Sequence, residues 1–411
     1  MTDILYDAKK IITAALKDAM PGAAVVDALH NISFGKGRLV VVAAGKAAWE
    51  MAKAANDSLG RRIDSGIVIT KYGHSHGAIA NLRICEAGHP VPDENSYKAT
   101  EQALELVKNL GENDEVLFLL SGGGSALFEK PAIPGEETEE ITKQLLASGA
   151  DIVEMNTIRK RLSLVKGGRF ALACRPAQVY TVVLSDIIGD PLDMIASGPA
   201  YPDASTCEQA LMIKEKYGLK MSAQAEELLK TETPKKLDNV TTFVTGSVKQ
   251  LCSTAERVCK RLGYETAFLT ASLSCEARDA GAFLGSIAAD NQNRKSIAYI
   301  AGGETVVHLK GKGKGGRNQE IALSAARYIE NCKNTCIFSV GSDGTDGPTD
   351  AAGGIVTEKT AAVLKEKNIN IPEVLENNDA YNALKAADGL IITGPTGTNV
   401  NDLSVVLIKR P

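Results

Sequence analysis

The chain of 411 residues is poor in aromatic side chains, which make up 5% of it and include a single tryptophan. It has 46 Lys and Arg against 50 Asp and Glu, a net charge of −4, and its basic residues form only local clusters such as 159–161. Proteins that bind nucleic acid usually carry a basic stripe with stacking aromatics. We therefore expect no nucleic-acid partner, and the lack of aromatics also disfavours a groove that stacks sugars.

Long apolar runs are absent too. Nowhere do 18 consecutive apolar residues occur, and the first residues are acidic rather than basic. We expect a soluble, cytoplasmic protein with no membrane partner.

The eight cysteines include no CxxC pair, so we expect reduced thiols packed as small hydrophobic side chains. His74 and His76 flank Ser75 in a predicted loop, which is more typical of a solvated turn than of a metal site.

Several catalytic signatures are missing. The sequence contains no G-x-x-x-x-G-K-[ST], no H-R-D or D-F-G pair and no G-x-S-x-G. This excludes a P-loop NTPase and a protein kinase, and it disfavours an α/β-hydrolase.

The chain does contain short apolar runs, each ending at a glycine or polar turn and followed by helical periodicity, which predicts an α/β fold. The predicted strands lie at 39–43, 66–70, 116–120, 179–184, 240–244, 264–269, 296–301, 305–309, 335–340, 390–393 and 403–408. We expect two α/β domains with mainly parallel sheets, the first of them Rossmann-like. A polar helical segment at 222–236 places the boundary, giving domains at 1–236 and 237–411, and the last strand could belong to either domain.

Glycines mark particular loops. Many of the 38 glycines fall in residues 122–124, 302–316, 341–354 and 394–397, after predicted strands. Open α/β sheets bind ligands beyond the carboxyl ends of their strands, and glycine lets main-chain N–H groups approach an anion. Residues 121–125, Ser-Gly-Gly-Gly-Ser, fit an anion cradle; a flexible turn that permits tight packing is the alternative.

Residues 311–316 match G-x-G-x-x-G, follow the predicted strand at 305–309 and open a predicted helix at 319–329. A dinucleotide fingerprint would stand earlier in its domain. Lys312, Lys314 and Arg317 favour a nucleoside triphosphate or phosphorylated substrate over NAD, with a basic hairpin loop as the alternative.

Two loops carry three carboxylates each. One loop contains Asp343, Asp346 and Asp350, and the other, at 185–193, contains Asp186, Asp190 and Asp193. Acids so close together need nearby cations, so we expect Mg²⁺ or Arg317 beside the first loop. Helix capping by Asp350 and turn chemistry are the alternative.

One acidic loop in each half suggests a site closed between the domains. Lys46 begins a predicted helix after an apolar strand, where anion binding is favoured.

These motifs together resemble a known family. Residues 42–48, 86–93, 120–125, 156–160, 165–169 and 185–199 are similar to the N-terminal part of the class II glycerate 2-kinases. Residues 302–305, 315–320, 342–354 and 393–401 are similar to the MOFRL domain of the same enzymes. The likeness covers essentially the whole chain, with many unrelated motifs in the family's order.

The resemblance implies ATP-dependent phosphorylation of D-glycerate at its 2-hydroxyl, giving 2-phosphoglycerate and ADP, with Mg²⁺, in a cleft between two α/β domains. A homodimer is compatible with it. Some members of the family have carried a hydroxypyruvate reductase label, so an NAD(P)H-dependent reductase stays open, as does a nucleotide-binding sensor without catalysis. The residues alone give neither the position of the new phosphate nor the adenine pocket.

Roles follow from phosphoryl-transfer chemistry and the resemblance together. The expected catalytic residues are Lys46, Arg317, Asp186 and Asp190, and the expected metal ligands are Asp343, Asp346 and Asp190. Spacing does not tell which carboxylate is the base. The expected substrate or nucleotide contacts are Ser121, Gly122, Gly123, Gly124, Ser125, Asn156, Lys166, Gly315, Gly316, Asn318 and Glu304.

Overall fold

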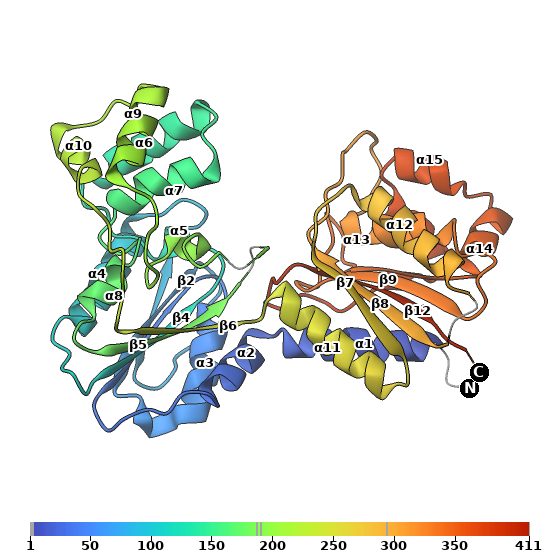
Figure 1. Ribbon diagram of the computed structural model, residues 1–411, viewed down its shortest axis with the longest axis horizontal. Helices are drawn as coiled ribbons and strands as arrows, with labels where there is room; N and C mark the ends of the chain where they lie inside the picture. Colours follow the sequence, from blue (N-terminus) through green and yellow to red (C-terminus); the bar gives the residue numbers. More distant parts are fainter. Residues whose placement is uncertain (1–3, 186–187, 190, 293–294, 411) are drawn as a thin grey trace. The chain divides into compact units, whose positions relative to one another are not determined.

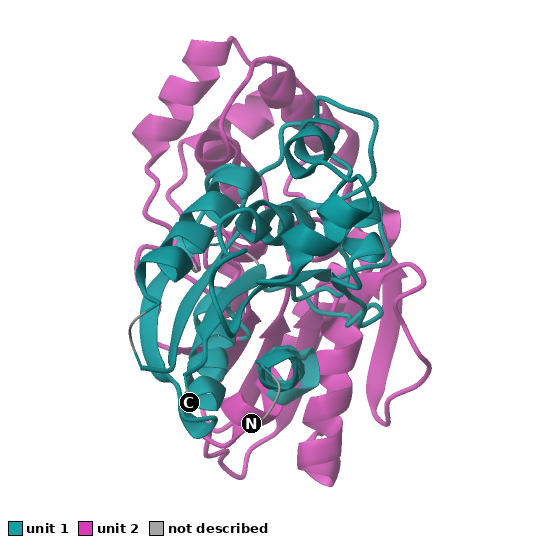
Figure 2. Cartoon of the chain, turned by 90° about the vertical axis from the view of Figure 1, so that its right-hand side faces the viewer, with its two compact units in different colours: residues 1–23, 186–189, 246–411 teal, residues 24–185, 190–245 magenta. Residues whose placement is uncertain are grey.

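A computed structural model describes residues 4–185, 188–189, 191–292 and 295–410. The chain forms two compact units (Figures 1 and 2). Unit 1 comprises residues 1–23, 186–189 and 246–411, and unit 2 comprises residues 24–185 and 190–245.

Unit 2 is built on a six-stranded sheet in the order β3-β2-β1-β4-β5-β6, in which every pairing is parallel. This is the strand order of a Rossmann fold, so the prediction of a Rossmann-like first domain is confirmed. Its strands are β1 (Leu39–Ala44), β2 (Ser65–Lys71), β3 (Leu82–Ala87), β4 (Glu115–Leu120), β5 (Gln178–Leu184) and β6 (Val240–Thr245).

The helices of unit 2 follow these strands, after α2 (Pro21–Leu29), which leads into the unit. They are α3 (Ala48–Leu59), α4 (Glu94–Val107), α5 (Gly124–Leu127), α6 (Gly135–Ala147), α7 (Ile152–Arg161), α8 (Arg169–Ala173), α9 (Cys207–Tyr217) and α10 (Ala223–Leu229), with short 3-10 helices η1 (Gly60–Arg62) and η2 (Ile195–Ser197). Helices α6, α7, α9 and α10 gather into a separate helical layer with its own small core (Figure 1).

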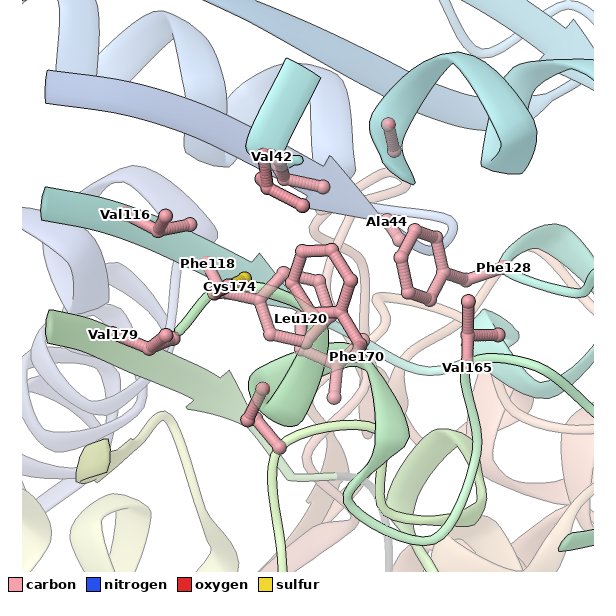
Figure 3. Packing of buried hydrophobic residues seen from close by; sticks show 14 of the residues in the cluster. Val42, Ala44, Val116, Phe118, Leu120, Phe128, Val165, Phe170, Cys174 and Val179 are labelled. Carbon is pink, nitrogen blue, oxygen red and sulfur yellow. The ribbon is translucent and has the colours of Figure 1, made fainter. Parts of the chain in front are cut away.

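The central strands of unit 2 are apolar along their whole length because both faces of the sheet are covered. Every residue of β1 and β4 is buried. In Figure 3, Phe118 from β4 lies against Phe128 and Phe170, with ring centroids 5.4 and 4.7 Å away. This packing fixes the segment after β4, which carries the residues 121–125.

Unit 1 contains a second six-stranded sheet in the order β11-β10-β9-β12-β8-β7. The strands are β7 (Glu265–Leu273), β8 (Ile297–Gly303), β9 (Thr335–Gly341), β10 (Gly353–Thr357), β11 (Leu390–Ile391) and β12 (Asp402–Ile408). The helices are α1 (Ile4–Asp18), α11 (Val248–Arg261), α12 (Ala277–Asp290), α13 (Arg317–Ala326), α14 (Thr360–Glu366), α15 (Ile371–Glu376) and α16 (Ala380–Ala386).

The α/β class is confirmed in both units, but the second sheet is mixed. Strand β7 pairs with β8 in parallel, whereas β12 runs antiparallel to both β8 and β9, and β10 runs antiparallel to β9 and β11. A strand that is buried on both faces is apolar whether its neighbours run parallel or antiparallel to it. The apolar runs in the sequence therefore did not reveal the antiparallel pairs of the second sheet.

Three further details differ from the sequence-based expectation. The prediction of a strand at 305–309 is wrong, because this segment forms no strand and pairs only through an isolated bridge between Val306 and Glu276. Strands β3 and β10 were missed. The compact units also divide differently from 1–236 and 237–411, because β6 completes the first sheet and α1 packs against α11 and β9.

The prediction that the cysteines are packed thiols is confirmed for five of the eight, whereas Cys85 and Cys207 are half-buried and Cys275 is exposed. Cys174, Cys252 and Cys259 are buried and free, and burial raises the pKa of Cys252 to about 12. In the described part of the chain, every helix is too short or too polar to span a bilayer.

Candidate active site

The loops after β1 and β4 are joined to each other at the centre of the first sheet. The Lys46 N–H donates to the Gly122 carbonyl at 2.9 Å, and the Ala47 N–H donates to Ser121 Oγ at 3.1 Å. In a sheet of this strand order, β1 and β4 flank the switch point at which the connections reverse, and a crevice for ligands opens there. Lys46 and the residues 121–125 therefore lie where a ligand of unit 2 is expected.

Two glycines make this close approach possible. Gly45 has a φ of +129°, and a Cβ atom there would lie 2.2 Å from Ser121 Oγ. Gly123 has a φ of +87°, and its Cβ would lie 3.0 Å from the His89 ring. Any other side chain would force the two loops apart or strain the backbone.

The glycine loop leaves main-chain donors available. Gly122 and Gly123 are half-buried, and within the described residues their N–H groups have no acceptor. The half-buried Lys46 likewise has no carboxylate partner in that part of the chain. Two unpaired N–H groups beside a lysine form an arrangement that binds an anion.

His89, just after β3, is a neighbour that was not singled out as a site residue. Its ring lies against Gly123, and burial, together with the charges of Lys46 and Lys71, lowers the pKa of His89. The imidazole is therefore neutral near pH 7 and can accept a hydrogen bond. Its place after a strand could have identified it, but β3 itself was not predicted.

The far end of the loop is held by a hydroxyl pair. Ser125 Oγ lies 3.3 Å from Ser197 Oγ, which donates to Asn156 Oδ1 at 3.1 Å. Ala196 and Ser197 have φ values of 50° and 61°, a conformation that costs free energy and often marks functional sites. Asn156, predicted as a ligand contact, is thus connected to the loop through a serine that the motifs did not single out. The predicted residues Asp186 and Asp190 lie outside the described residues.

Lys166 is fully enclosed by protein. Its side chain is 0% exposed, its Nζ lies 2.8 Å from Glu129 Oε2, and it donates to the Ser125 and Phe128 carbonyls at 2.8 and 3.2 Å. All three ammonium hydrogens have partners, so this lysine supports the loop rather than contacting a substrate directly.

In unit 1, the charged residues converge at one edge of the second sheet. Asp402 at the start of β12 pairs in register with Gly303 at the end of β8 and Gly341 at the end of β9. The predicted residues Glu304 and Asp343 follow those two strands directly, so the antiparallel pairing brings them to the same edge.

Arg317, the first residue of α13, binds two carboxylates there. Its Nε donates to Asp402 Oδ2 at 2.6 Å and its Nη2 donates to Asp402 Oδ1 at 3.2 Å. Its Nη1 donates to Glu304 Oε1 at 2.9 Å. Burial opposes the charge of Arg317, but the ion pair with Asp402 outweighs it and raises the pKa of the guanidinium. The expectation that Arg317 pairs with an acid of the 342–350 loop is not what the structure shows; the partner Asp402 was missed because its strand reads as purely apolar.

Asp346 caps helix α13. Its two carboxylate oxygens accept hydrogen bonds from the N–H groups of Asn318 at 3.1 Å and Gln319 at 2.9 Å. Burial raises the pKa of Asp346 to about 7, against the lowering effect of these two N–H groups. Gly316 allows the approach, since a Cβ there would lie 2.3 Å from Asp346 Cγ. Asp346 thus occupies the anion position at this helix N-terminus, which differs from its predicted role as a metal ligand.

The predicted phosphate loop at 311–316 has most of its donors engaged. The N–H groups of Gly311, Lys312 and Lys314 donate to the side chains of Asn378, Asn377 and Asp379, and that of Gly313 donates to the Asn377 carbonyl. Of the contacts predicted here, Gly315 and Gly316 lie against the neighbouring loops, and the Asn318 side chain is buried and accepts from Ser339 Oγ.

Asp343 differs from Asp346 in being half-buried. Its Oδ1 accepts from the Thr345 N–H at 3.0 Å, while its Oδ2 has no partner in the described chain. Asp350 accepts from the Tyr381 hydroxyl and precedes a strand, so it does not cap a helix. Within the described residues, no three or more His, Cys, Asp or Glu side chains gather so that they could hold a metal. His74 and His76 are therefore not part of such a group.

Comparisons with known proteins place these features in one family. The profile of a domain of unknown function, DUF4147, matches residues 7–230, and that of the MOFRL family matches residues 297–402. The D-glycerate 2-kinase of Thermotoga maritima is 52% identical, over 97% of this chain and 97% of its own length.

A solved structure and a further relative are also similar to this chain over nearly its whole length. A crystal structure of the glycerate kinase from Thermotoga maritima superposes with a TM-score of 0.94 at 52% identity, covering 98% of this chain and 99% of that one. A relative from Agrobacterium vitis with a provisional hydroxypyruvate reductase name is 39% identical, over 90% of this chain and 100% of its own length. The chain belongs to the class II glycerate 2-kinase family, with an N-terminal DUF4147 domain and a C-terminal MOFRL domain.

Proposed function

We propose that this protein transfers the γ-phosphoryl group of ATP to the 2-hydroxyl of D-glycerate, giving 2-phosphoglycerate and ADP. The observation that carries the proposal is the pair of unengaged N–H groups at Gly122 and Gly123 beside Lys46, at the switch point of a Rossmann-type sheet. Family membership supplies the substrate, since the 52% identical relative is named a D-glycerate 2-kinase.

In this mechanism the protein supplies charge and position rather than covalent chemistry. The N–H groups of Gly122 and Gly123 and the Lys46 ammonium would bind phosphoryl oxygens. These donors would offset the negative charge that develops on the phosphoryl oxygens during transfer. The neutral His89 ring beside Gly123 can accept a hydrogen bond from a substrate hydroxyl.

Arg317 is the proposed second cation. Asp402 holds two of its nitrogens, which fixes the direction of the guanidinium fork, while the contact with Glu304 is partly exposed. A planar guanidinium suits a phosphoryl group or the glycerate carboxylate. An anionic ligand can replace Glu304 as the partner of Arg317 without disturbing the pair with Asp402.

Mg²⁺ fits the unengaged carboxylate oxygen of Asp343. Magnesium in kinases is commonly held by one or two carboxylates together with substrate phosphates and water, so one available oxygen suffices on the protein side. When bound, the ion would neutralise phosphate charge. Asp346 fits this role poorly because both of its oxygens already accept hydrogen bonds from α13.

The reductase alternative has less support from the structure. A dinucleotide fingerprint needs a strand before its glycines and unengaged N–H groups for the pyrophosphate. Here the segment before residues 311–316 forms only an isolated bridge, and the N–H groups of residues 311–314 are engaged by residues 377–379.

The test is an assay of ADP release with D-glycerate, ATP and Mg²⁺, followed by phosphorus NMR of the product. We expect ADP only when glycerate is present, and a 2-phosphate. Oxidation of NADH by hydroxypyruvate without ADP formation would favour the reductase, and ATP binding without turnover would favour a sensor.

Lys46→Ala is expected to lower kcat/KM by about two or more orders of magnitude, the size measured for removal of one transition-state contact. Lys53→Ala is the matched control, because Lys53 lies on α3 and, among the described residues, pairs with the exposed Asp57 alone. Equal activity in the two variants would remove Lys46 from the site.

A further inference from the structure

Unit 2 contains a cavity in which Asn156 is the one lining residue already named as a candidate contact. It has a volume of about 500 Å³ and lies in the helical layer, lined by α7, α9 and residues 193–194 and 203–205. Cavities of this size hold small organic ligands. D-glycerate, with three carbons, would leave most of it empty.

Two exposed apolar side chains stand on facing helices at this cavity. Val153 on α7 is 59% exposed and Met212 on α9 is 60% exposed, and α7 contacts α9. Single exposed apolar residues are ordinary, but two lining the same cavity offer apolar surface that a flat ligand could cover. Methionine adapts its shape and makes favourable contacts with aromatic rings.

Polar groups complete the lining. Gln209 supplies an amide, and the Asp193 carboxylate, with 36% of its side chain exposed, can accept hydrogen bonds from hydroxyl groups. Both lysines of the lining are paired, Lys160 with Asp203 at 3.1 Å and Asp193 at 3.4 Å, and Lys216 with Glu154 at 2.6 Å, so the cavity presents little net positive charge. This set suits a neutral ring with amide-like edges and a diol better than it suits a phosphate or a carboxylate.

The cavity is also connected to the anion loop. Asn156, which lines it, accepts from Ser197 Oγ, and Ser197 Oγ contacts Ser125 at the end of the glycine loop. A ligand with phosphates at Gly122 and Gly123 could therefore extend past Asn156 into the cavity. A nucleotide has this elongated form, with one charged end and one flat end.

We infer that this cavity binds the adenosine part of ATP, with the adenine ring against Val153 and Met212 and the ribose hydroxyls toward Asp193. The inference rests on the proposed kinase function for the position of the phosphates. It assigns to the cavity a ligand class, a purine nucleoside, that the motifs did not locate.

The test replaces the two apolar side chains by polar ones of similar size, in the double variant Val153→Thr, Met212→Gln of the full chain. The matched control is Ile152→Thr, Leu146→Gln, because these residues are 58% and 61% exposed in the same helical layer but do not line the cavity. We expect the KM for ATP to rise about tenfold in the cavity variant alone, with the KM for D-glycerate unchanged.

A second readout does not depend on catalysis. Adenosine, which lacks phosphates, is titrated against each protein and its binding is followed by saturation-transfer NMR. It should bind the wild type and the control, and bind the cavity variant about tenfold more weakly.

The outcomes separate the two proposals. An unchanged KM for ATP in the cavity variant, a rise in the KM for D-glycerate instead, or equal adenosine binding by all three proteins would each overturn the adenosine site while leaving the kinase in place. If the wild type forms no ADP, the proposed function fails, and the adenosine titration still decides whether the cavity binds a nucleoside.

Discussion

Replacing Lys166 by methionine isolates the role of the buried pair that supports the glycine loop. The substitution keeps the length and apolar stem of the side chain but removes its charge. Among the described residues, it leaves Glu129, 4% exposed, with the Ser163 hydroxyl as its hydrogen-bond partner, and it leaves the Ser125 and Phe128 carbonyls without their ammonium donor.

The expected cost is about 3–5 kcal/mol, the range for breaking a buried ion pair by removing one partner. The loss reflects the unpaired carboxylate as well as the lost attraction. The double variant Lys166→Met, Glu129→Gln should therefore recover most of the loss, since glutamine carries no charge and keeps an oxygen for Ser163 Oγ.

The single tryptophan provides the assay. Trp49 lies in α3 of unit 2 and is 8% exposed, so its fluorescence during denaturant unfolding reports on unit 2 alone. The free energy of unfolding is compared among wild type, single and double variants, and kcat is measured in each.

Two results would refute this reasoning. A Lys166→Met protein as stable as wild type would show that the ion pair contributes little. A double variant that regains stability and yet stays as inactive as one lacking Lys46 would indicate that Lys166 contacts the substrate directly.

Three further predictions concern single side chains. Arg317→Lys should lower kcat/KM about a hundredfold with the thermal unfolding followed by circular dichroism unchanged, because lysine cannot hold Asp402 with two nitrogens; a rate near wild type would count against this role. Gly123→Ala should raise the KM for ATP about tenfold, since alanine disfavours a φ of +87° by about 1–2 kcal/mol and would contact His89; an unchanged KM would refute the cradle. The pKa of Asp346 is raised from 3.8 to about 7, so the native state binds its proton more tightly than the unfolded chain, and stability should fall as pH rises between these values. Asp346→Asn should flatten that dependence in thermal unfolding followed by circular dichroism, and a slope equal to that of wild type would contradict the assignment.

Apolar runs ending at glycines were sufficient to predict the first sheet, because parallel strands buried on both faces leave that signature. The second sheet shares the signature but is mixed, and strand direction depends on connections that no local pattern records. Strand β3, with Arg83 and Glu86 in its interior, lies at the sheet edge and lacks the apolar run.

Candidate site residues could be proposed from the sequence where a charge follows an apolar strand, as Lys46 does, or stands just before a predicted helix, as Arg317 does. The same rule could not tell an unengaged donor from an engaged one. Residues 311–316 look like a phosphate loop, yet residues 377–379, far along the chain, take most of the N–H groups, and Asp346 takes the helix terminus. Asp402 and Ser197 were missed because their roles arise from tertiary pairing.

The packing of α1 has a consequence for synthesis. This first helix contacts α11 and β9, Asp7 binds Tyr264 and Lys409, and β12, the last strand, lies between β8 and β9. Unit 1 therefore cannot complete its sheet until β12 has left the ribosome, whereas the sheet of unit 2 needs no strand after β6 and can form earlier. During translation α1 is synthesised long before α11 and β9, the elements against which it packs. Shortening the amino terminus should therefore impair folding of the carboxyl-terminal half.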